Sequence, residues 1–208
     1  MEFADNFQDI IKKFNIPRNF KILEIGCADL RLDSFELINY FENYFGIDKN
    51  SNFINEACKK IRFYPNANVM KISIEDFNPN NKMYDVIVCN DSLAYVDKKK
   101  ILKKIYDLLK MNGLFISFRN NTYDYTLRKF LYEKNSTKKY GRVEEFIHSI
   151  MVSFNMIIYR ILGVRLIHTT WSSERELKKL LKDASYKYYE VNTTKAGRYK
   201  TVSCIAQK

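Results

Sequence analysis

Residues 21–30, KILEIGCADL, pass from a strand-like apolar pattern to a run of small residues. This stretch constrains the fold more than any other. The first half alternates apolar residues in the manner of a β-strand, and a turn of small residues follows at Gly26, Cys27 and Ala28. A glycine at a strand end lets the backbone pass close to a ligand, because no Cβ is in the way. A tight turn of this kind also occurs for purely structural reasons, so the rest of the chain must decide between the two readings.

Helical and strand patterns alternate on both sides of this turn. A capping box at Asp5 and Gln8 predicts a first helix that Pro17 ends. The spacing of apolar residues then predicts a helix at 35–41, a strand at 44–48, a helix at 53–61, strands at 68–72 and 84–90, a helix at 101–109 ended by Gly113, and a strand at 114–118. Such alternation predicts an α/β fold with an open, mostly parallel sheet, whose ligands bind outside the carboxyl ends of the strands.

The alternation stops after Arg119. We interpret residues 120–170 as an inserted helical cap, rich first in Tyr, Lys and Asn and then in Ile and Met. A second capping box, Ser173 with Glu176, predicts one more helix, and strands at 186–191 and 200–207 close the chain around a hairpin at 192–198. Because repeats and low-complexity linkers are absent from the sequence, we expect residues 1–208 to form a single domain.

Asp48 ends the second predicted strand, 24 residues beyond Glu24, where a carboxylate can accept both hydroxyls of a ribose. Together with the turn it indicates a ligand that contains a nucleoside. A dinucleotide fingerprint would require glycines where the chain has Ala28 and Arg31, and no strand is followed by the G-K-S or G-K-T of a P-loop.

Six blocks in this order resemble the class I S-adenosylmethionine-dependent methyltransferases: KILEIGCADLRL, YFGIDKN, ISIEDF, YDVIVCNDSLAYV, ILKKIYDLLKMNGLFISF and the terminal hairpin. The match covers residues 20–118 and 172–207. It implies a Rossmann-like, doubly wound, seven-stranded sheet, mostly parallel with a C-terminal antiparallel hairpin. It also implies S-adenosylmethionine as the cofactor.

The resemblance places the cofactor along four strand ends. Glu24 and Gly26 fall at its methionine end, Asp48 at its ribose, and Asn90 beside its methionine part and the substrate. The turn after the third strand falls at its adenine. The full expected set is Glu24, Gly26, Cys27, Ala28, Asp48, Lys49, Ser73, Ile74, Glu75 and Asn90.

The sequence departs from the family pattern in three places. The usual three glycines read Gly26, Ala28 and Leu30; Ala28 can be tolerated if its φ is negative, and we expect Leu30 to pack beneath the following helix. Ser73 stands where an acid is frequent, although Glu75 could compensate. Tyr95 stands where many relatives have a histidine.

The expected reaction is an in-line methyl transfer to a small-molecule acceptor with an oxygen or nitrogen nucleophile, for which the protein mainly aligns the reacting atoms. Candidate catalytic residues are Asp91, Tyr95 and His168, and candidate substrate-binding residues are Arg119, Tyr123, Tyr125 and Trp171. A histidine titrates near neutrality and an arginine can pair with an acidic substrate. Packing at the cap is the alternative role for each tyrosine, and a hydrogen-bonded loop position is the alternative for His168.

Two other functions compete with this one. The net charge of +11 favours polyanions, which makes an RNA methyltransferase an alternative. The Asn/Asp-Pro-Pro-aromatic signature of base methylation is missing, however, because Asp91, Ser92 and Leu93 follow Asn90. A noncatalytic cofactor-binding module is the other alternative, suggested by Ala28, Leu30 and Ser73.

The remaining patterns concern surroundings rather than chemistry. The four cysteines, Cys27, Cys58, Cys89 and Cys204, are too scattered for a C-x-x-C metal pair, so we expect no metal site and a reducing, cytoplasmic location. Residues 146–164 approach the length of a membrane span, but three polar residues interrupt them, and we expect a buried or lid helix instead.

Overall fold

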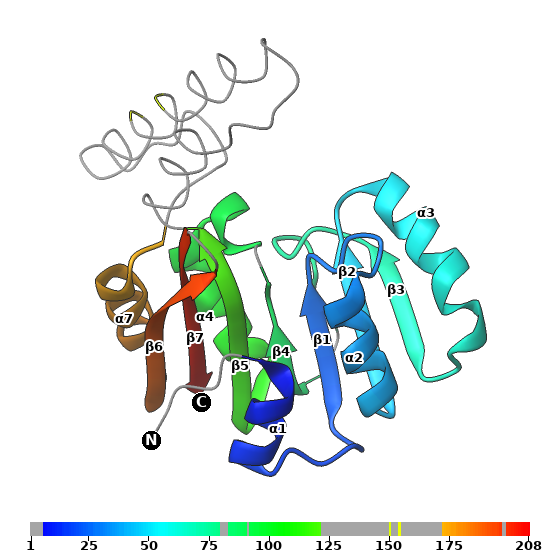
Figure 1. Cartoon of the computed structure of the whole chain (residues 1–208), viewed down its shortest axis with the longest axis horizontal. Helices are drawn as coiled ribbons and strands as arrows, with labels where there is room; N and C mark the ends of the chain where they lie inside the picture. The colour runs from blue at the N-terminus through cyan, green and yellow to red at the C-terminus, as the bar shows by residue number, and fades with distance from the viewer. Residues whose placement is uncertain are drawn as a thin grey trace.

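A computed structural model describes residues 6–79, 83–90, 92–121, 150, 154, 172–196 and 199–208. Seven strands of this part of the chain form one sheet in the order β3-β2-β1-β4-β5-β7-β6 (Figure 1). They are β1 (Lys21–Ile25), β2 (Asn43–Asp48), β3 (Ala67–Lys71), β4 (Tyr84–Val88), β5 (Leu109–Asn121), β6 (Tyr188–Ala196) and β7 (Tyr199–Gln207). The first five run parallel, and β7 pairs antiparallel with β5 and β6. The predicted doubly wound sheet with a C-terminal antiparallel hairpin is confirmed.

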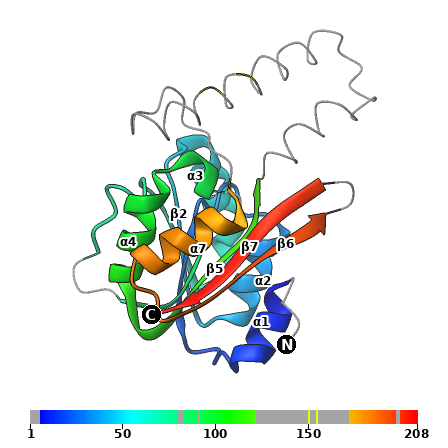
Figure 2. The same ribbon diagram turned by 90° about the vertical axis from the view of Figure 1, so that its left-hand side faces the viewer.

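Helices cover both faces of the sheet. On one face lie α1 (Phe7–Phe14), α2 (Leu32–Tyr40) and α3 (Ser51–Lys60), whose apolar side chains pack with those of Ile22, Val86 and Ile116. On the other face lie α4 (Lys98–Leu108) and α7 (Glu174–Asp183), side by side, with Leu23, Ile87 and Phe115 beneath them (Figure 2). Alternate residues of β1 and β4 therefore belong to different cores, which explains why parallel central strands read as nearly continuous apolar runs.

The connection from β3 to β4 has no helix in its described residues, 72–79 and 83. A short turn stands there instead, in which the N–H groups of Asp76 and Phe77 both donate to the carbonyl of Ser73. Ile74 and Phe77 are buried on the α4 face, and the Phe77 ring stacks on Phe45 with 5.9 Å between centroids. Two apolar side chains thus do the covering that a crossover helix would otherwise provide.

Helix α1 begins one residue away from its predicted cap. Its N-cap is Asn6, whose side chain accepts from the N–H of Asp9, so the capping box at Asp5 and Gln8 is wrong. The second predicted cap is confirmed, because the Ser173 hydroxyl accepts from the N–H of Glu176 at the start of α7.

Gly113 does not end α4, contrary to the sequence prediction. The helix ends at Leu108, and Gly113 lies inside β5, where the pairing with β4 shifts register. A Cβ at Gly113 would lie 2.9 Å from the Lys110 carbonyl oxygen and 3.2 Å from that of Asp85, so this glycine permits a close approach of two strands. The predicted hairpin connection is also shorter than expected, because β6 continues to Ala196 and β7 begins at Tyr199.

Candidate functional site

The chain reverses its direction across the sheet between β1 and β4. Strands β2 and β3 add on one side of β1, and β4 and β5 add on the other. In an open α/β sheet, this reversal leaves a crevice outside the carboxyl ends of the strands, and ligands bind there. Three segments meet at that edge of the molecule: the turn after β1, Asp48 at the end of β2, and the residues that follow β4.

The turn after β1 is tied to the end of β2 by backbone hydrogen bonds. The N–H groups of Gly26 and Cys27 both donate to the carbonyl of Ile47, at 2.8 and 3.1 Å, and the N–H of Ala28 donates to the Asp48 carboxylate at 3.1 Å. The N–H of Leu30 closes the turn by donating to the Cys27 carbonyl at 3.1 Å.

Every second residue of this turn has a left-handed backbone. The φ angles are +73° at Gly26, +49° at Ala28 and +61° at Leu30. The condition of a negative φ at Ala28 is therefore not met, because the turn points three successive N–H groups at β2 and keeps this alternating geometry although alanine stands in place of glycine. Each non-glycine residue in this region costs about 1 to 2 kcal/mol. Leu30 is buried in the core beneath α2, as expected, and its burial offsets the cost.

Asp48 offers a half-buried carboxylate to the crevice. One oxygen accepts from the N–H of Ala28 and the other from the N–H of Asn50 at 2.8 Å. A carboxylate has about four acceptor positions, so both oxygens can still accept another donor. The chemistry and the location fit a pair of ribose hydroxyls. The next residue, Lys49, is exposed.

Glu24 is buried instead, with 4% of its surface exposed. The Tyr44 hydroxyl donates to one carboxyl oxygen at 2.5 Å, and the Ser34 hydroxyl donates to the other at 3.1 Å. Burial raises the pKa of Glu24 from 4.5 to about 7, although both hydrogen bonds act in the opposite direction. The carboxyl thus lies between β1, β2 and α2, underneath the turn.

The Cys27 side chain also points into the protein. It is 2% exposed, and its sulfur would lie 2.9 Å from a Cβ placed on Gly46. Burial raises the pKa of this thiol, and the negative charges of Glu24 and Asp48 raise it further. The Cys27 side chain is therefore not available to a ligand on the surface, and its N–H is already bonded to the Ile47 carbonyl.

The segment after β4 lies directly against Gly26. A Cβ on Gly26 would lie 2.1 Å from the Ser92 hydroxyl oxygen, so protein atoms fill the space that we expected a ligand to use. The same hydroxyl donates to the Asn90 carbonyl at 2.9 Å, and the Asn90 side chain accepts from the N–H of Phe118 at 3.1 Å. Asn90 thus links β4 to β5. Tyr95, in the short helix η2 (Leu93–Tyr95), is half exposed.

The predicted adenine turn has two exposed carboxyl residues, Glu75 and Asp76, next to a half-buried hydroxyl residue, Ser73. The Ser73 hydroxyl is engaged with Asp76, to which it donates at 2.7 Å. Ile74 belongs to the core and cannot present its side chain to a ligand. Glu75 is exposed, and its carbonyl accepts from Lys104 at 2.6 Å.

Arg119 lies at the carboxyl end of the parallel part of β5 and pairs with Asp33, in the first turn of α2, at 3.0 Å. An acidic substrate would have to compete with Asp33 for the guanidinium. The other predicted residues of the acceptor site lie outside the described residues: Asp91, Tyr123, Tyr125, His168 and Trp171. Most of the predicted cap at 120–170 and of the apolar stretch at 146–164 lies outside them too.

Three residues with defined positions at this site were missed by sequence reasoning: Ser34, Tyr44 and Ser92. Tyr44 carried a usable signal, because it stands two residues before Gly46 on the same face of β2. A strand glycine at that spacing leaves room for a long side chain to lie over it. Ser34 and Ser92 carried no comparable signal.

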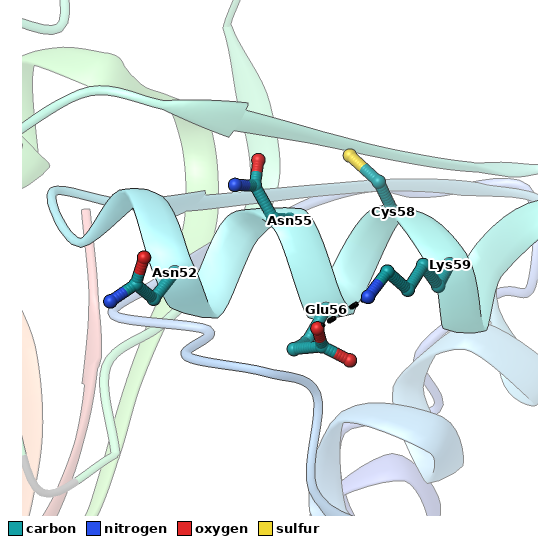
Figure 3. A pocket seen from close by; sticks show the side chains of 5 residues that line it. All are labelled: Asn52, Asn55, Glu56, Cys58 and Lys59. Atoms are coloured by element: carbon teal, nitrogen blue, oxygen red, sulfur yellow. Dashed lines mark hydrogen bonds and ion pairs between the residues drawn. The ribbon is translucent and has the colours of Figure 1, made fainter.

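A shallow depression also lies along the outer side of α3. Figure 3 shows the five side chains that line it, Asn52, Asn55, Glu56, Cys58 and Lys59, with Lys59 paired to Glu56 at 2.6 Å. All five come from one exposed helix, and none comes from a strand end, so we place the site at the crevice. In the part of the chain that the structure describes, no cluster of His, Cys, Asp and Glu could hold a metal ion, and no helix is long and apolar enough to cross a membrane.

A left-handed turn over a strand-end carboxylate, at the reversal point of a doubly wound sheet, defines an α/β protein of the nucleoside-binding kind. Residues 23–115 match the family model described as a methyltransferase domain. This match, which covers a little under half of the chain, confirms the resemblance to the class I S-adenosylmethionine-dependent methyltransferases that was read from the sequence.

Two curated relatives match part of the chain. One, from Ilyobacter polytropus, is named malonyl-[acyl-carrier protein] O-methyltransferase 1 and is 28% identical over 130 residues, which cover 60% of this chain and 47% of the relative. The other, from Campylobacter fetus, is named carboxy-S-adenosyl-L-methionine synthase and is 26% identical over 121 residues, covering 55% and 50%. The chain thus spans about half the length of the curated relatives it matches.

Solved structures share the fold over nearly the whole chain. A S-adenosylmethionine-dependent methyltransferase from Methanosarcina mazei superposes with a TM-score of 0.67 at 19% identity, covering 98% of both chains. The N-methyltransferase NodS from Bradyrhizobium japonicum, in complex with S-adenosyl-L-homocysteine, superposes with a TM-score of 0.62 at 14% identity, covering 97% of this chain and 84% of NodS.

Proposed function

We propose that this chain transfers a methyl group from S-adenosylmethionine to a small-molecule acceptor that attacks through oxygen or nitrogen. The observation that carries the proposal is the Asp48 carboxylate, positioned at the end of β2 by the N–H groups of Ala28 and Asn50 and still able to accept hydroxyl donors. The match to the methyltransferase domain model supports S-adenosylmethionine as the cofactor. The chain's relatives leave both nucleophiles open, since one is named an O-methyltransferase and another an N-methyltransferase.

The chain's own part in the reaction is binding and alignment. When bound, S-adenosylmethionine supplies a methyl group already activated by its sulfonium, so no strong acid is needed from the protein. Asp48 would orient the ribose by accepting its hydroxyls. The turn at Gly26 to Leu30 would fix the main chain beside the methionine part, with Asn90 and Ser92 closing the β4 side.

A base is needed only where the acceptor is a poor nucleophile. We assign Asp91, Tyr95 and His168 as candidates for it, and Arg119, Tyr123, Tyr125 and Trp171 as candidates for acceptor binding. Among the three candidate bases, Tyr95 is the one within the described residues, and it is half exposed in the short helix η2 that follows β4. Arg119 would release Asp33 to bind an acidic acceptor.

The domain organisation and the location of the protein belong to the same proposal. We infer one domain over residues 1–208, with residues 120–170 as the inserted cap that selects the acceptor. The four free cysteines support a cytoplasmic location, where thiols stay reduced.

Calorimetry with S-adenosylmethionine and S-adenosylhomocysteine, followed by labelled methyl transfer to a metabolite extract, tests the proposal. We expect both ligands to bind and a small-molecule fraction to become labelled. Binding of neither ligand would overturn the proposal. Label transferred to RNA, with a steep loss of binding in salt, would replace the acceptor class.

A noncatalytic cofactor-binding module is the second candidate, because Ser92 fills the space beside Gly26. It predicts that S-adenosylhomocysteine binds and that no extract becomes labelled. A Ser92→Gly variant removes the Ser92 hydroxyl that lies beside Gly26 and separates the two candidate functions. If methyl transfer appears in this variant, the contact with Ser92 is what prevents turnover.

A further inference from the structure

A buried network of hydroxyls holds Glu24 in a position that the family resemblance does not explain. The carboxyl accepts from Tyr44 on β2 at 2.5 Å and from Ser34 on α2 at 3.1 Å, and all three side chains are buried. Both donors come from elements that flank the turn after β1. The carboxyl is therefore fixed underneath the turn rather than left free to contact the methionine end of the cofactor.

Gly46 makes this arrangement possible. It is the register partner of Glu24 on β2, and a Cβ placed on it would lie 2.9 Å from the Tyr44 hydroxyl oxygen. The tyrosine ring can therefore lie along β2 over the glycine until its hydroxyl reaches the neighbouring strand. A side chain at position 46 would push the hydroxyl away from the carboxyl.

Few charges surround Glu24 on the elements that pack against it. Helix α2 contributes Asp33, which already pairs with Arg119, and the turn contributes the Cys27 thiol. Strand β4 contributes an apolar neighbour, Val88, in register with Glu24. The described residues thus provide no cation in contact with the carboxyl, and its two partners are neutral hydroxyls.

We propose that Tyr44 and Ser34 are positioning residues, which hold Glu24 beneath the turn so that its ionisation distinguishes a sulfonium cofactor from its neutral thioether product. The inference rests on the proposed function, since it assumes that S-adenosylmethionine and S-adenosylhomocysteine occupy the crevice above the turn. A negative charge in a poorly solvated place acts over a longer distance than one in water, because solvent screens it less.

Glu24 ionises near neutral pH. Burial raises the pKa of Glu24 to about 7, so the carboxyl is mostly neutral below this pH and mostly charged above it. The charged form attracts a sulfonium but not a thioether. Affinity for S-adenosylmethionine relative to S-adenosylhomocysteine should therefore rise as the pH rises through neutrality.

Calorimetry with the two ligands at pH 6.0 to 8.5 tests this inference. The measured quantity is the ratio of the two dissociation constants, taken in the natural protein and in Glu24→Gln. Between the ends of the range we expect the preference for the sulfonium to rise about fivefold more in the natural protein than in Glu24→Gln, the low end of typical coupling between two sites.

The Tyr44→Phe variant tests the positioning role through the midpoint of the pH profile, which a purely structural role of Tyr44 would leave unchanged. The hydrogen bond from Tyr44 lowers the pKa of Glu24, so its loss should shift the midpoint of the pH profile upward. The matched control is Tyr40→Phe, which removes a different tyrosine hydroxyl, one that donates to the Ile16 carbonyl at 2.6 Å. The control should leave the midpoint unchanged.

The outcomes separate the two proposals. If both ligands bind but their ratio changes equally in the natural protein and in Glu24→Gln, the inference about Glu24 is wrong and the proposed function stands. If Tyr40→Phe moves the midpoint as far as Tyr44→Phe does, the positioning role of Tyr44 is wrong. If neither ligand binds, both proposals are wrong.

Discussion

Glu24 and Asp48 are carboxylates near the carboxyl ends of two adjacent strands, but they differ in burial and in their hydrogen-bond donors. Glu24 is buried and accepts from two side-chain hydroxyls, whereas Asp48 is half-buried and accepts from two main-chain N–H groups. Burial raises the pKa of Glu24 to about 7. The difference arises from position along the strands: the register pairs Glu24 with Gly46, so Glu24 is buried beneath α2, whereas Asp48 lies two residues farther on, at the carboxyl edge of the sheet.

An acid of the strand-end motif can therefore influence ligand binding from beneath the turn, without contacting the ligand. A carboxylate at the rim can accept ligand hydroxyls directly. One underneath the turn acts through charge and through the shape it gives the turn. Each of the following changes acts on one of the two carboxylates or on the turn that joins them.

The largest expected effect is on folding stability after Glu24→Gln. Because the folded protein holds a proton on Glu24 that the unfolded chain releases above pH 4.5, stability falls as pH rises from 4.5 through 7, by about 3 kcal/mol in total. The glutamine variant should lose this dependence and be the more stable protein at pH 8. Urea unfolding at pH 5 and pH 8 measures the difference.

Glu42→Gln is the matched control for that experiment, because Glu42 is an exposed carboxyl in the connection just before β2. It should leave the pH dependence unchanged. Equal stability of Glu24→Gln and the natural protein at both pH values would mean that Glu24 titrates like a surface carboxyl, and the contrast with Asp48 would disappear.

Asp48→Ala should instead affect ligand affinity. Loss of charge-assisted hydrogen bonds to ribose hydroxyls should weaken S-adenosylhomocysteine binding by about 1 to 3 kcal/mol. Calorimetry measures it. Asp29→Asn is the control, since Asp29 is in the same turn but its carboxylate pairs with Lys60 on α3 at 2.7 Å. An equal loss in both variants would place the ribose away from Asp48.

Most of the fold could be read from the sequence, because hydrophobic period and strand-end residues act locally. The apolar runs at β1 and β4 and the cap at Ser173 are where the pattern put them. Gly113 was misread as a helix end, because a glycine that stops a helix and one that allows two strands to approach look alike in a single sequence.

The candidate site was less predictable, for two physical reasons. The φ of Ala28 is set by the hydrogen bonds that its neighbours make to β2, which side-chain identity does not reveal. The contacts of Tyr44 with Glu24, and of Ser92 with Gly26, join segments that are far apart in the chain. Both kinds of information exist only once the sheet has been assembled.

Ala28→Gly should have a smaller, stabilising effect on the turn that joins the two carboxylates. Glycine removes the cost of a left-handed alanine, and part of this gain is lost because glycine makes the unfolded chain more flexible, so we expect about 0.5 to 1 kcal/mol. Thermal unfolding measures it. The control is Ala57→Gly inside α3, which should destabilise the protein, since glycine is a poor helix former. A destabilised Ala28→Gly would contradict the φ of +49°.

The smallest effect concerns the thiol of Cys27, whose pKa burial raises and both carboxylates raise further, Glu24 more than Asp48. Cys58 is the exposed cysteine and should be alkylated first, so it serves as the internal reference.

At pH 8.5, where Glu24 is charged, Glu24→Gln should speed alkylation of Cys27 more than Asp48→Asn does, as mass spectrometry of the modified peptides can measure. At pH 6 the order of the two variants should reverse, because Glu24 is already neutral there and only the charge on Asp48 remains to be removed. A larger effect of Asp48→Asn at pH 8.5 would make the rim carboxylate the stronger charge beneath the turn and reverse the roles assigned to the two acids.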